Sequence, residues 1–253
     1  VNPLFNNPEN GDFSFPVSSP AVVMKGSEEA VLLGDSRWWP NLTFPSNIHW
    51  GTTHNSLSGL TITWDNQTQD DSIRWGYTKK MEIGTFPAER TDNYQVTSNP
   101  EYLFNYTFPD VTPSSTIYYS IKFNGLWSKV RTFVTSVDTA SSKFTFIVGA
   151  DQQVGKEKWQ KLSDMALKES ADFCLMVGDI VDNSEYPSEW EEYYDYGKNF
   201  LEKTLCYYTH GNHVYYDAAS GQITLNQLVL PENEKWYSFK QGNTLFVCLL
   251  SEP

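Results

Sequence analysis

Residues 171–183 read ADFCLMVGDIVDN, an apolar run of strand length that ends at Gly178 and Asp179. A nearly continuous apolar run of this kind is typical of a strand buried on both faces of a parallel sheet. Two other stretches repeat the pattern, KFTFIVGADQQ at 143–153 and LCYYTHGNH at 205–213. In all three, a glycine stands shortly before the polar group that ends the run, where it lets the backbone turn sharply.

The segments between these strands have helical spacing. Residues 156–170 place Trp159, Leu162 and Met165 on one side, and residues 187–204 start with a proline, as many helices do. Strand, helix, strand, helix, strand with apolar strands predicts a parallel sheet covered by helices. The C-terminal segments KWYSF and TLFVCLLSE predict two further strands joined by a tight turn.

Upstream of residue 136 the pattern changes to short alternating strands separated by turn residues. This rhythm predicts an antiparallel β-sandwich of the fibronectin-III-like kind over residues 44–137. The small, polar segment 136–142 predicts a linker to an α/β domain over residues 143–253, and the Asn-, Pro- and Gly-rich residues 1–43 predict an extension. The strands expected in the sandwich are 60–64, 72–77, 102–108, 116–123 and 127–135.

Composition narrows the functional classes. The chain has 253 residues, of which 40% are hydrophobic, and its 31 acidic and 18 basic residues give a net charge of −13, which disfavours a coat that binds nucleic acid. No apolar run approaches the roughly 18 residues of a membrane span. The three cysteines lie in apolar stretches and are expected to be buried and free, at positions Cys174, Cys206 and Cys248.

The polar ends of the three apolar strands are the candidate site. Ligands of a parallel sheet bind outside the carboxyl ends of its strands, where Asp151, Asp179 and the pair Asn212–His213 are expected. Each residue alone is typical of a turn or a helix cap, but three successive strand ends with such groups are hard to explain separately. Because carboxylates in an acidic chain repel one another, we expect bound cations, and hard divalent or trivalent ions suit these oxygens.

The same three stretches resemble the calcineurin-like metallophosphoesterases, and the layout is similar to that of purple acid phosphatases. The family motifs are D-x-H or a lone D, G-D-x-x-D and G-N-H-[E/D], and this chain has Asp151-Gln152-Gln153, Gly178-Asp179-Ile180-Val181-Asp182 and Gly211-Asn212-His213-Val214. The resemblance covers about residues 44–253. It implies an α/β/β/α sandwich and hydrolysis of a small phosphate mono- or diester with two metal ions, such as Fe, Mn or Zn.

The resemblance also implies a role for each matching residue. Asp151 would bind the first metal ion, Asp179 would bridge both ions and Asn212 would bind the second. His213 would contact the phosphate and protonate the leaving oxygen, with Asp182 orienting its imidazole.

Two positions depart from the family pattern. Gln153 stands where many relatives have histidine, and two interpretations stay open for it, a weak or water-mediated metal ligand and a loop residue. Val214 replaces the usual acid after G-N-H, which weakens whatever supporting role that acid has.

A larger departure from the family pattern is the lack of further metal-binding histidines. Relatives place further metal-binding histidines after a strand such as TLFVCLLSE, whereas this chain has only four histidines, and we expect structural roles for His49, His54 and His210. The family domain would be only half present, which predicts a truncated chain in preference to one completed from elsewhere. Such a half-site should bind metal poorly and be weakly active or inactive.

A second function stays open at this stage. The protein could be a non-catalytic surface or adhesion protein whose Trp-rich sandwich binds a partner and whose α/β part is degenerate, with Trp50, Trp64, Trp75 and Trp127 as its support. Purple-phosphatase-like layouts are usually exported and the chain starts at Val1, so we expect a secreted or periplasmic protein. Substrate, metal identity, oligomeric state and glycosylation of the three sequons are beyond the sequence.

Overall fold

The structure is a computed structural model that describes residues 22–24, 30–32, 44–67, 71–91, 102–123, 125–138, 140–141, 143–153, 155–216 and 221–251. Most of the predicted extension, residues 1–43, and its sequon at Asn41 therefore lie outside the described residues. Within that segment two short strands, β1 (Val22–Met24) and β2 (Ala30–Leu32), pair antiparallel.

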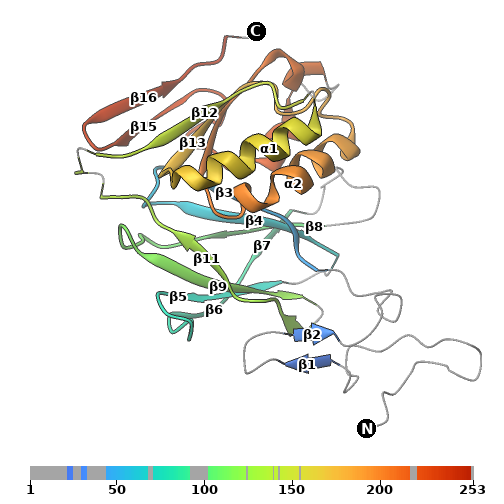
Figure 1. The fold of residues 1–253 in the computed structure, drawn as a ribbon, viewed down its shortest axis with the longest axis vertical. Coiled ribbons are helices and arrows are strands. Elements are labelled where there is room, and N and C mark those ends of the chain that lie inside the picture. Colours follow the sequence, from blue (N-terminus) through green and yellow to red (C-terminus); the bar gives the residue numbers. More distant parts are fainter. Residues whose placement is uncertain are drawn as a thin grey trace, which may run out of the picture.

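The first large unit is a sandwich of two antiparallel sheets (Figure 1). One sheet has the order β3-β4-β8-β7 and the other the order β10-β9-β5-β6, with β11 also pairing with β9. The strands are β3 (Ser46–Thr52), β4 (Leu60–Asn66), β5 (Ser72–Gly76), β6 (Gly84–Pro87), β7 (Glu89–Thr91), β8 (Tyr102–Thr107), β9 (Thr116–Phe123), β10 (Leu126–Trp127) and β11 (Arg131–Val134). These two sheets account for every strand that the alternating pattern predicted, and they add β3, β6 and β7.

Aromatic side chains fill the space between the two sheets. Trp50 stacks on Phe133 with ring centroids 3.9 Å apart, and Trp64 and Trp75 are also almost completely buried. Trp127 is half-buried and lies under the guanidinium of Arg74, 4.5 Å from the ring centroid. Three of the four tryptophans that could have formed a binding surface are therefore core residues, as most strand aromatics are.

The predicted strand 127–135 is wrong as one continuous element. It is divided into β10 and β11 because Ser128 interrupts the ladder with its own polar groups. The Ser128 hydroxyl accepts the backbone N–H of Ile121 at 3.0 Å, and its carbonyl accepts the Ser120 hydroxyl at 2.6 Å. A side chain that takes over a ladder hydrogen bond in this way ends regular pairing.

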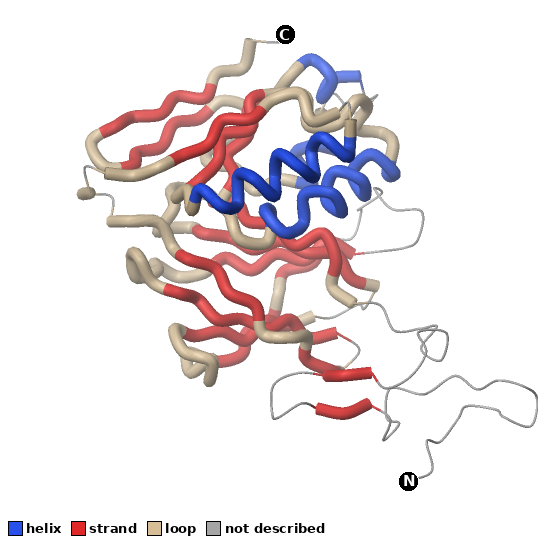
Figure 2. Tube along the Cα trace, viewed as in Figure 1, coloured by secondary structure: helices blue, strands red, loops and turns tan. Residues whose placement is uncertain are grey.

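The second unit is the predicted alternation of strands and helices. Strands β12, β13 and β14 pair in parallel in that order, and α1 and α2 lie side by side against the sheet (Figures 1 and 2). The elements are β12 (Phe146–Gly149), α1 (Lys156–Ala166) with the 3-10 turn η3 (Leu167–Glu169), β13 (Phe173–Val177), α2 (Pro187–Leu201), β14 (Cys206–Thr209), the 3-10 helix η4 (Asn212–Tyr216) and α3 (Gln222–Gln227). The elements η4 and α3 were not predicted.

A β-hairpin forms a third layer. Strands β15 (Tyr237–Gln241) and β16 (Thr244–Cys248) are the two predicted C-terminal strands, and they turn at Gly242. Phe239 stacks on Tyr207 at 3.6 Å and Phe246 contacts Phe173 at 5.3 Å. Because side chains alternate along a strand, these contacts lie on the face opposite the helices, and the described layers are helix, sheet and sheet.

The two units are joined by a wide contact. The indole N–H of Trp50 donates to the carbonyl of Glu202 at 2.9 Å, and the N–H of Thr52 donates to the carbonyl of Val229 at 3.0 Å. A Cβ on Gly51 would lie 2.3 Å from that Val229 oxygen, so only glycine allows this approach. The predicted linker is also anchored, since the Val137 N–H donates to Asp172 Oδ1 at 3.2 Å. The units are therefore expected to move as one body.

Asp71 is a buried acid in the sandwich. Its Oδ2 accepts the indole N–H of Trp64 at 2.8 Å and the amide of Asn66 at 3.0 Å, and burial raises its pKa to about 6. The same contact occupies the side-chain nitrogen of the sequon residue Asn66, which is buried, so a glycan at Asn66 is incompatible with this fold. The remaining described sequon residue, Asn105, is half-buried and accepts the Thr63 hydroxyl at 2.7 Å.

This environment predicts that Asp71→Asn stabilises the protein in a pH-dependent way. Between the ordinary carboxyl pKa and about 6 the folded state binds more protons than the unfolded state, so Asp71 costs stability increasingly as the pH rises. We expect the Asn variant to melt about 5 °C above the wild type at pH 7.5, with the difference vanishing towards pH 4. Differential scanning fluorimetry at both pH values, with the exposed Asp110→Asn as control, measures it. A gain that is equal at both pH values would contradict the assignment.

Candidate metal and phosphate site

Parallel pairing brings the ends of three strands to one edge of the sheet. The N–H of Asp151 donates to the carbonyl of Gly178 at 3.4 Å, and the N–H of Gly178 donates to the carbonyl of Thr209 at 3.2 Å. One step further, the N–H of Gln153 donates to the carbonyl of Asp179 at 3.2 Å. The segments after β12, β13 and β14 are thus bonded to one another in that order.

Asp179 is aimed at the segment that follows β14. Gly178 and Asp179 both have left-handed backbone angles, φ 79° and φ 49°, so the chain reverses direction as soon as β13 ends. The Asp179 carboxylate then lies over Gly211, and its Oδ1 accepts the backbone N–H of His213 at 3.2 Å. Asp179 and the Gly211–His213 segment are therefore in direct contact.

His213 is held by Asp182. Its Nδ1 lies 2.7 Å from the carbonyl oxygen of Asp182 and 3.1 Å from the carboxylate Oδ1 of the same residue. Both partners are acceptors, so Nδ1 carries the proton in this contact. The proton on Nδ1 is therefore fixed by Asp182, and Nε2 is the ring nitrogen that takes no part in this contact. The His213 side chain is 20% exposed.

Asp151 and Asn212 are exposed at the same edge. Asn212 is the first residue of η4, directly after Gly211. The side chain of Val214, which departs from the family pattern, is outside the described part of the structure.

Gln153 is placed differently from its neighbours. Its side chain lines a small pocket of about 20 Å³ on the helix side of the loop, together with Lys156, Tyr193 and Glu189. Its amide oxygen is buried and has no hydrogen-bond partner among the described residues. The neighbouring Gln152 donates from Nε2 to the sulfur of Met176 at 3.2 Å.

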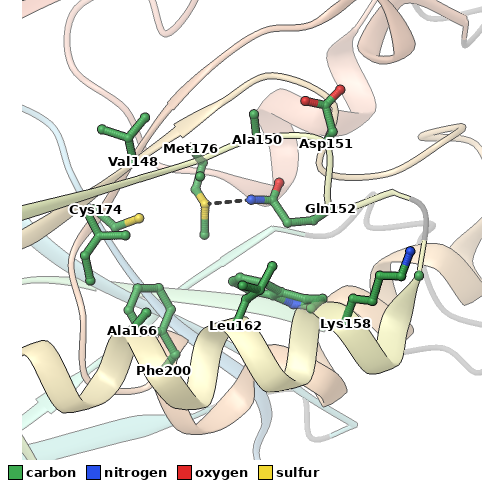
Figure 3. Close-up of a pocket in the computed structure, with 14 residues that line it drawn as sticks. Val148, Ala150, Asp151, Gln152, Lys158, Leu162, Ala166, Cys174, Met176 and Phe200 are labelled. Carbon is green, nitrogen blue, oxygen red and sulfur yellow. Dashed lines mark hydrogen bonds between the residues drawn. The ribbon is translucent and has the colours of Figure 1, made fainter.

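A larger, mostly apolar pocket of about 320 Å³ lies between β12 and α1 (Figure 3). Asp151 and Lys158 contribute to its lining, and Leu162, Met176 and Phe200 supply part of its apolar wall. In Figure 3 the side chain of Gln152 extends across the pocket towards Met176, whereas the Asp151 carboxylate points away from it. This pocket has Asp151 at its border, but neither Asp179 nor His213 lines it.

Of the other three histidines, His49 and His54 lie in the sandwich, and His210 directly follows β14. His49 is buried between the two units, where its Nε2 lies 2.8 Å from the carbonyl of Gln227 and burial lowers its pKa. His210 is buried with Nδ1 3.2 Å from the Tyr215 hydroxyl, and burial lowers its pKa too. His54 contacts the Thr53 hydroxyl in a sandwich loop. The cysteines, as expected, are buried and free.

The donor set suits hard cations. Asp151, Asp179 and Asn212 offer carboxylate and amide oxygens, which Mg²⁺, Mn²⁺ and Fe ions accept. Over the described residues, no three His, Cys, Asp or Glu side chains gather into a cluster that could hold a metal ion. The candidate metal site is therefore a small set of oxygen donors, Asp151, Asp179 and Asn212, at an exposed edge of the sheet.

The comparisons with known proteins agree with this geometry. Residues 144–250 match the family model of the calcineurin-like phosphoesterases. This region is similar to that family. No curated protein matches the chain. The predicted resemblance to metallophosphoesterases is thereby confirmed.

Two solved phosphatase structures share the fold of this chain. The first is the purple acid phosphatase PPD1 from yellow lupin (Lupinus luteus) seeds, with a TM-score of 0.67, 16% identity, and coverage of 80% of this chain and 44% of that chain. The second is PhoD, with a TM-score of 0.56, 12% identity, and coverage of 82% and 52%. The chain thus spans about half the length of either structure. The shared fold is a β-rich part followed by an α/β part.

One polar residue of the site region was not predicted. Glu189, on the first turn of α2, accepts the backbone N–H groups of Asp182 at 2.6 Å and Asn183 at 2.9 Å through one oxygen, Oε2. The sequence did hold a signal for it, because a glutamate two positions after a proline at a helix start commonly bonds backbone amides that precede the helix.

The contact between Gly211 and Asp179 predicts the effect of Gly211→Ala. An added Cβ would lie 2.0 Å from Asp179 Oδ1 and 2.7 Å from the Asp179 nitrogen, so the carboxylate and the loop must shift. We expect a loss of about 1–3 kcal/mol in the free energy of unfolding, measured by urea denaturation.

Gly125→Ala is the matched control, because a Cβ there meets nothing within 4 Å and only its φ of 79° is unfavourable. A structure of Gly211→Ala with Asp179 unmoved and stability unchanged would contradict the close approach described above.

Proposed function

We propose that the protein hydrolyses phosphate mono- or diesters with two metal ions held at the edge formed by β12, β13 and β14. The observation that carries the proposal is the bonded series of strand ends, in which Asp179 contacts the Gly211–His213 segment while Asp151 is bonded to Gly178 next to it. The match of residues 144–250 to the calcineurin-like phosphoesterase family model supports the reaction class.

In this proposal the oxygens of three residues hold the cations. Asp151 would hold the first ion, Asp179 would be shared by both and Asn212 would hold the second, while Gln153 is the weakest candidate because it lines a pocket on the helix side. Metal ions bound there would supply Lewis acidity and a hydroxide near neutral pH. Fe, Mn and Zn are the ions proposed, and the donor set does not choose among them.

His213 is the proposed general acid. Its backbone is fixed by Asp179 and its ring by Asp182, so Nε2 is the nitrogen that would contact the phosphate and give a proton to the leaving oxygen. Asp182 limits the rotation of the ring through its two contacts with Nδ1, as an acceptor on the distant ring nitrogen does in other histidine-dependent sites. The small number of described oxygen donors leads us to expect weak metal binding and low activity of the chain as given.

The non-catalytic alternative has lost its main support, because Trp50, Trp64 and Trp75 are buried in the sandwich core. We propose that the sandwich is fibronectin-III-like, since its sheets have the strand order of that architecture, and that the protein is exported. No helix of the described part of the chain is both long and apolar enough to cross a membrane. Fractionation of cells that make the natural protein tests export.

Asp179→Asn tests the proposed function. Removing one charge from the residue between the two ions is expected to lower bound metal from about two ions to one or none and to reduce hydrolysis of p-nitrophenyl phosphate by at least about 100-fold. Metal content by plasma mass spectrometry and phosphatase rates with Mn, Fe or Zn are measured on the natural gene product.

Asp110→Asn is the matched control, an identical exchange at an exposed turn of the sandwich. It should leave metal content and rate unchanged. The proposal fails if the wild type holds no metal and shows no metal-dependent hydrolysis, or if the two variants behave alike.

A further inference from the structure

Glu189 connects helix α2 to the loop that contacts the candidate acid. Its Oε2 accepts two consecutive backbone N–H groups, those of Asp182 and Asn183, at 2.6 and 2.9 Å. Hydrogen bonds to a carboxylate are shorter and stronger than those between neutral groups. A glutamate at this helix position usually bonds the amide of the residue before the helix, but here the Tyr186 N–H donates to the carbonyl of Asn183 at 3.1 Å. Glu189 therefore holds the loop itself.

The loop needs such an anchor because its functional side chain is exposed. Asp182 has 59% of its side chain accessible, so packing does not fix its position. Its N–H is held by Glu189, and its carbonyl and carboxylate oxygens both contact Nδ1 of His213. Asp182 is therefore held by Glu189 of α2 and in turn holds the imidazole of His213.

We propose that Glu189 is a positioning residue for His213, acting through Asp182. This inference rests on the proposed function for its effect on hydrolysis, although the positioning itself is a property of the folded chain. The side-chain hydrogen bonds described for Glu189 are with the backbone of Asp182 and Asn183, so we assign it to the support of the proton donor and not to the proposed metal ligands.

Glu192 provides a matched comparison on the same helix. It is one turn further along α2, lines the same small pocket as Glu189, and forms an ion pair with Lys156. It makes no described contact with residues 182–183. Replacing Glu192 by Ala therefore removes a carboxylate from the same helix surface without releasing the loop.

The test uses Glu189→Ala, Glu189→Gln and Glu192→Ala in the natural gene product. A misplaced general acid slows esters with poor leaving groups more than esters with good ones, because only the former need a proton. We expect Glu189→Ala to lower kcat on phenyl phosphate by roughly 10- to 100-fold, on p-nitrophenyl phosphate by under about 5-fold, and to leave KM nearly unchanged. Glu189→Gln keeps an acceptor oxygen and should retain most activity, and Glu192→Ala should resemble the wild type.

A second measurement does not depend on activity. In protein labelled with ¹⁵N-histidine, the Nδ1 resonance of His213 should shift in Glu189→Ala and remain in place in Glu192→Ala. Thermal melting shows whether Glu189→Ala is folded. If it is not, Glu189→Gln replaces it in this measurement, and we expect a smaller shift of the His213 Nδ1 resonance.

The two hypotheses can fail separately. A wild type without phosphatase activity defeats the proposed function, while the ¹⁵N shift still decides whether Glu189 positions His213. The positioning role is overturned if His213 Nδ1 is unchanged in Glu189→Ala, if both esters slow equally, or if Glu192→Ala has the same effect.

Discussion

Parallel pairing of β13 with β12 on one side and β14 on the other is the constraint on which the candidate site depends. Parallel strands start and end together, so any polar residue placed just after each strand must meet its counterparts at one edge. The backbone bonds from Asp151 to Gly178 and from Gly178 to Thr209 extend this alignment beyond the strands. A one-residue slip of β13 would turn Met176 towards the hairpin and Phe173 towards the helices, exchanging two faces that are both filled.

The layers around the sheet explain why that register is fixed. On the helix side, the Trp159 indole donates to the Tyr193 carbonyl at 2.9 Å, and the Tyr193 hydroxyl lies 3.0 Å from that of Tyr208. On the other side, Phe239 stacks on Tyr207. The sandwich adds a support at the far end of β14, where Trp50 pairs with Leu205 in an isolated bridge. Polar contacts and ring stacking thus hold β13 and β14 from three directions, and the site edge carries the exposed residues Asp151 and Asn212.

The sequence predicted the elements whose pattern reflects burial and missed those that depend on single side chains. The apolar runs around Phe173 and Cys206 identified the parallel strands, because full burial on both faces leaves no other composition. The break in the strand at Ser128 could not be predicted, since it arises from a hydroxyl that bonds a residue on a neighbouring strand. Within the site, the glycine before each polar group was informative, as Gly211 illustrates. The pocket that Gln153 lines was not, because part of its wall comes from α2, far along the chain.

The backbone at the site is itself unusual, and this bears on what the edge is for. Asp151 and Asp179 both have positive φ, 58° and 49°, a conformation that costs energy for any residue other than glycine and that Asp tolerates better than most. Asp179 follows Gly178, which is also left-handed, so the two residues together turn the carboxylate back over Gly211. A turn that only had to leave the strand could use a less demanding conformation. Two acidic residues that follow neighbouring strands, in a chain with a net charge of −13, favour a cation over an anion as the ligand of this edge. The backbone cost has a physical explanation if cations occupy the edge, as proposed, since binding of an ion by the carboxylates would offset the strain of the turns that carry them.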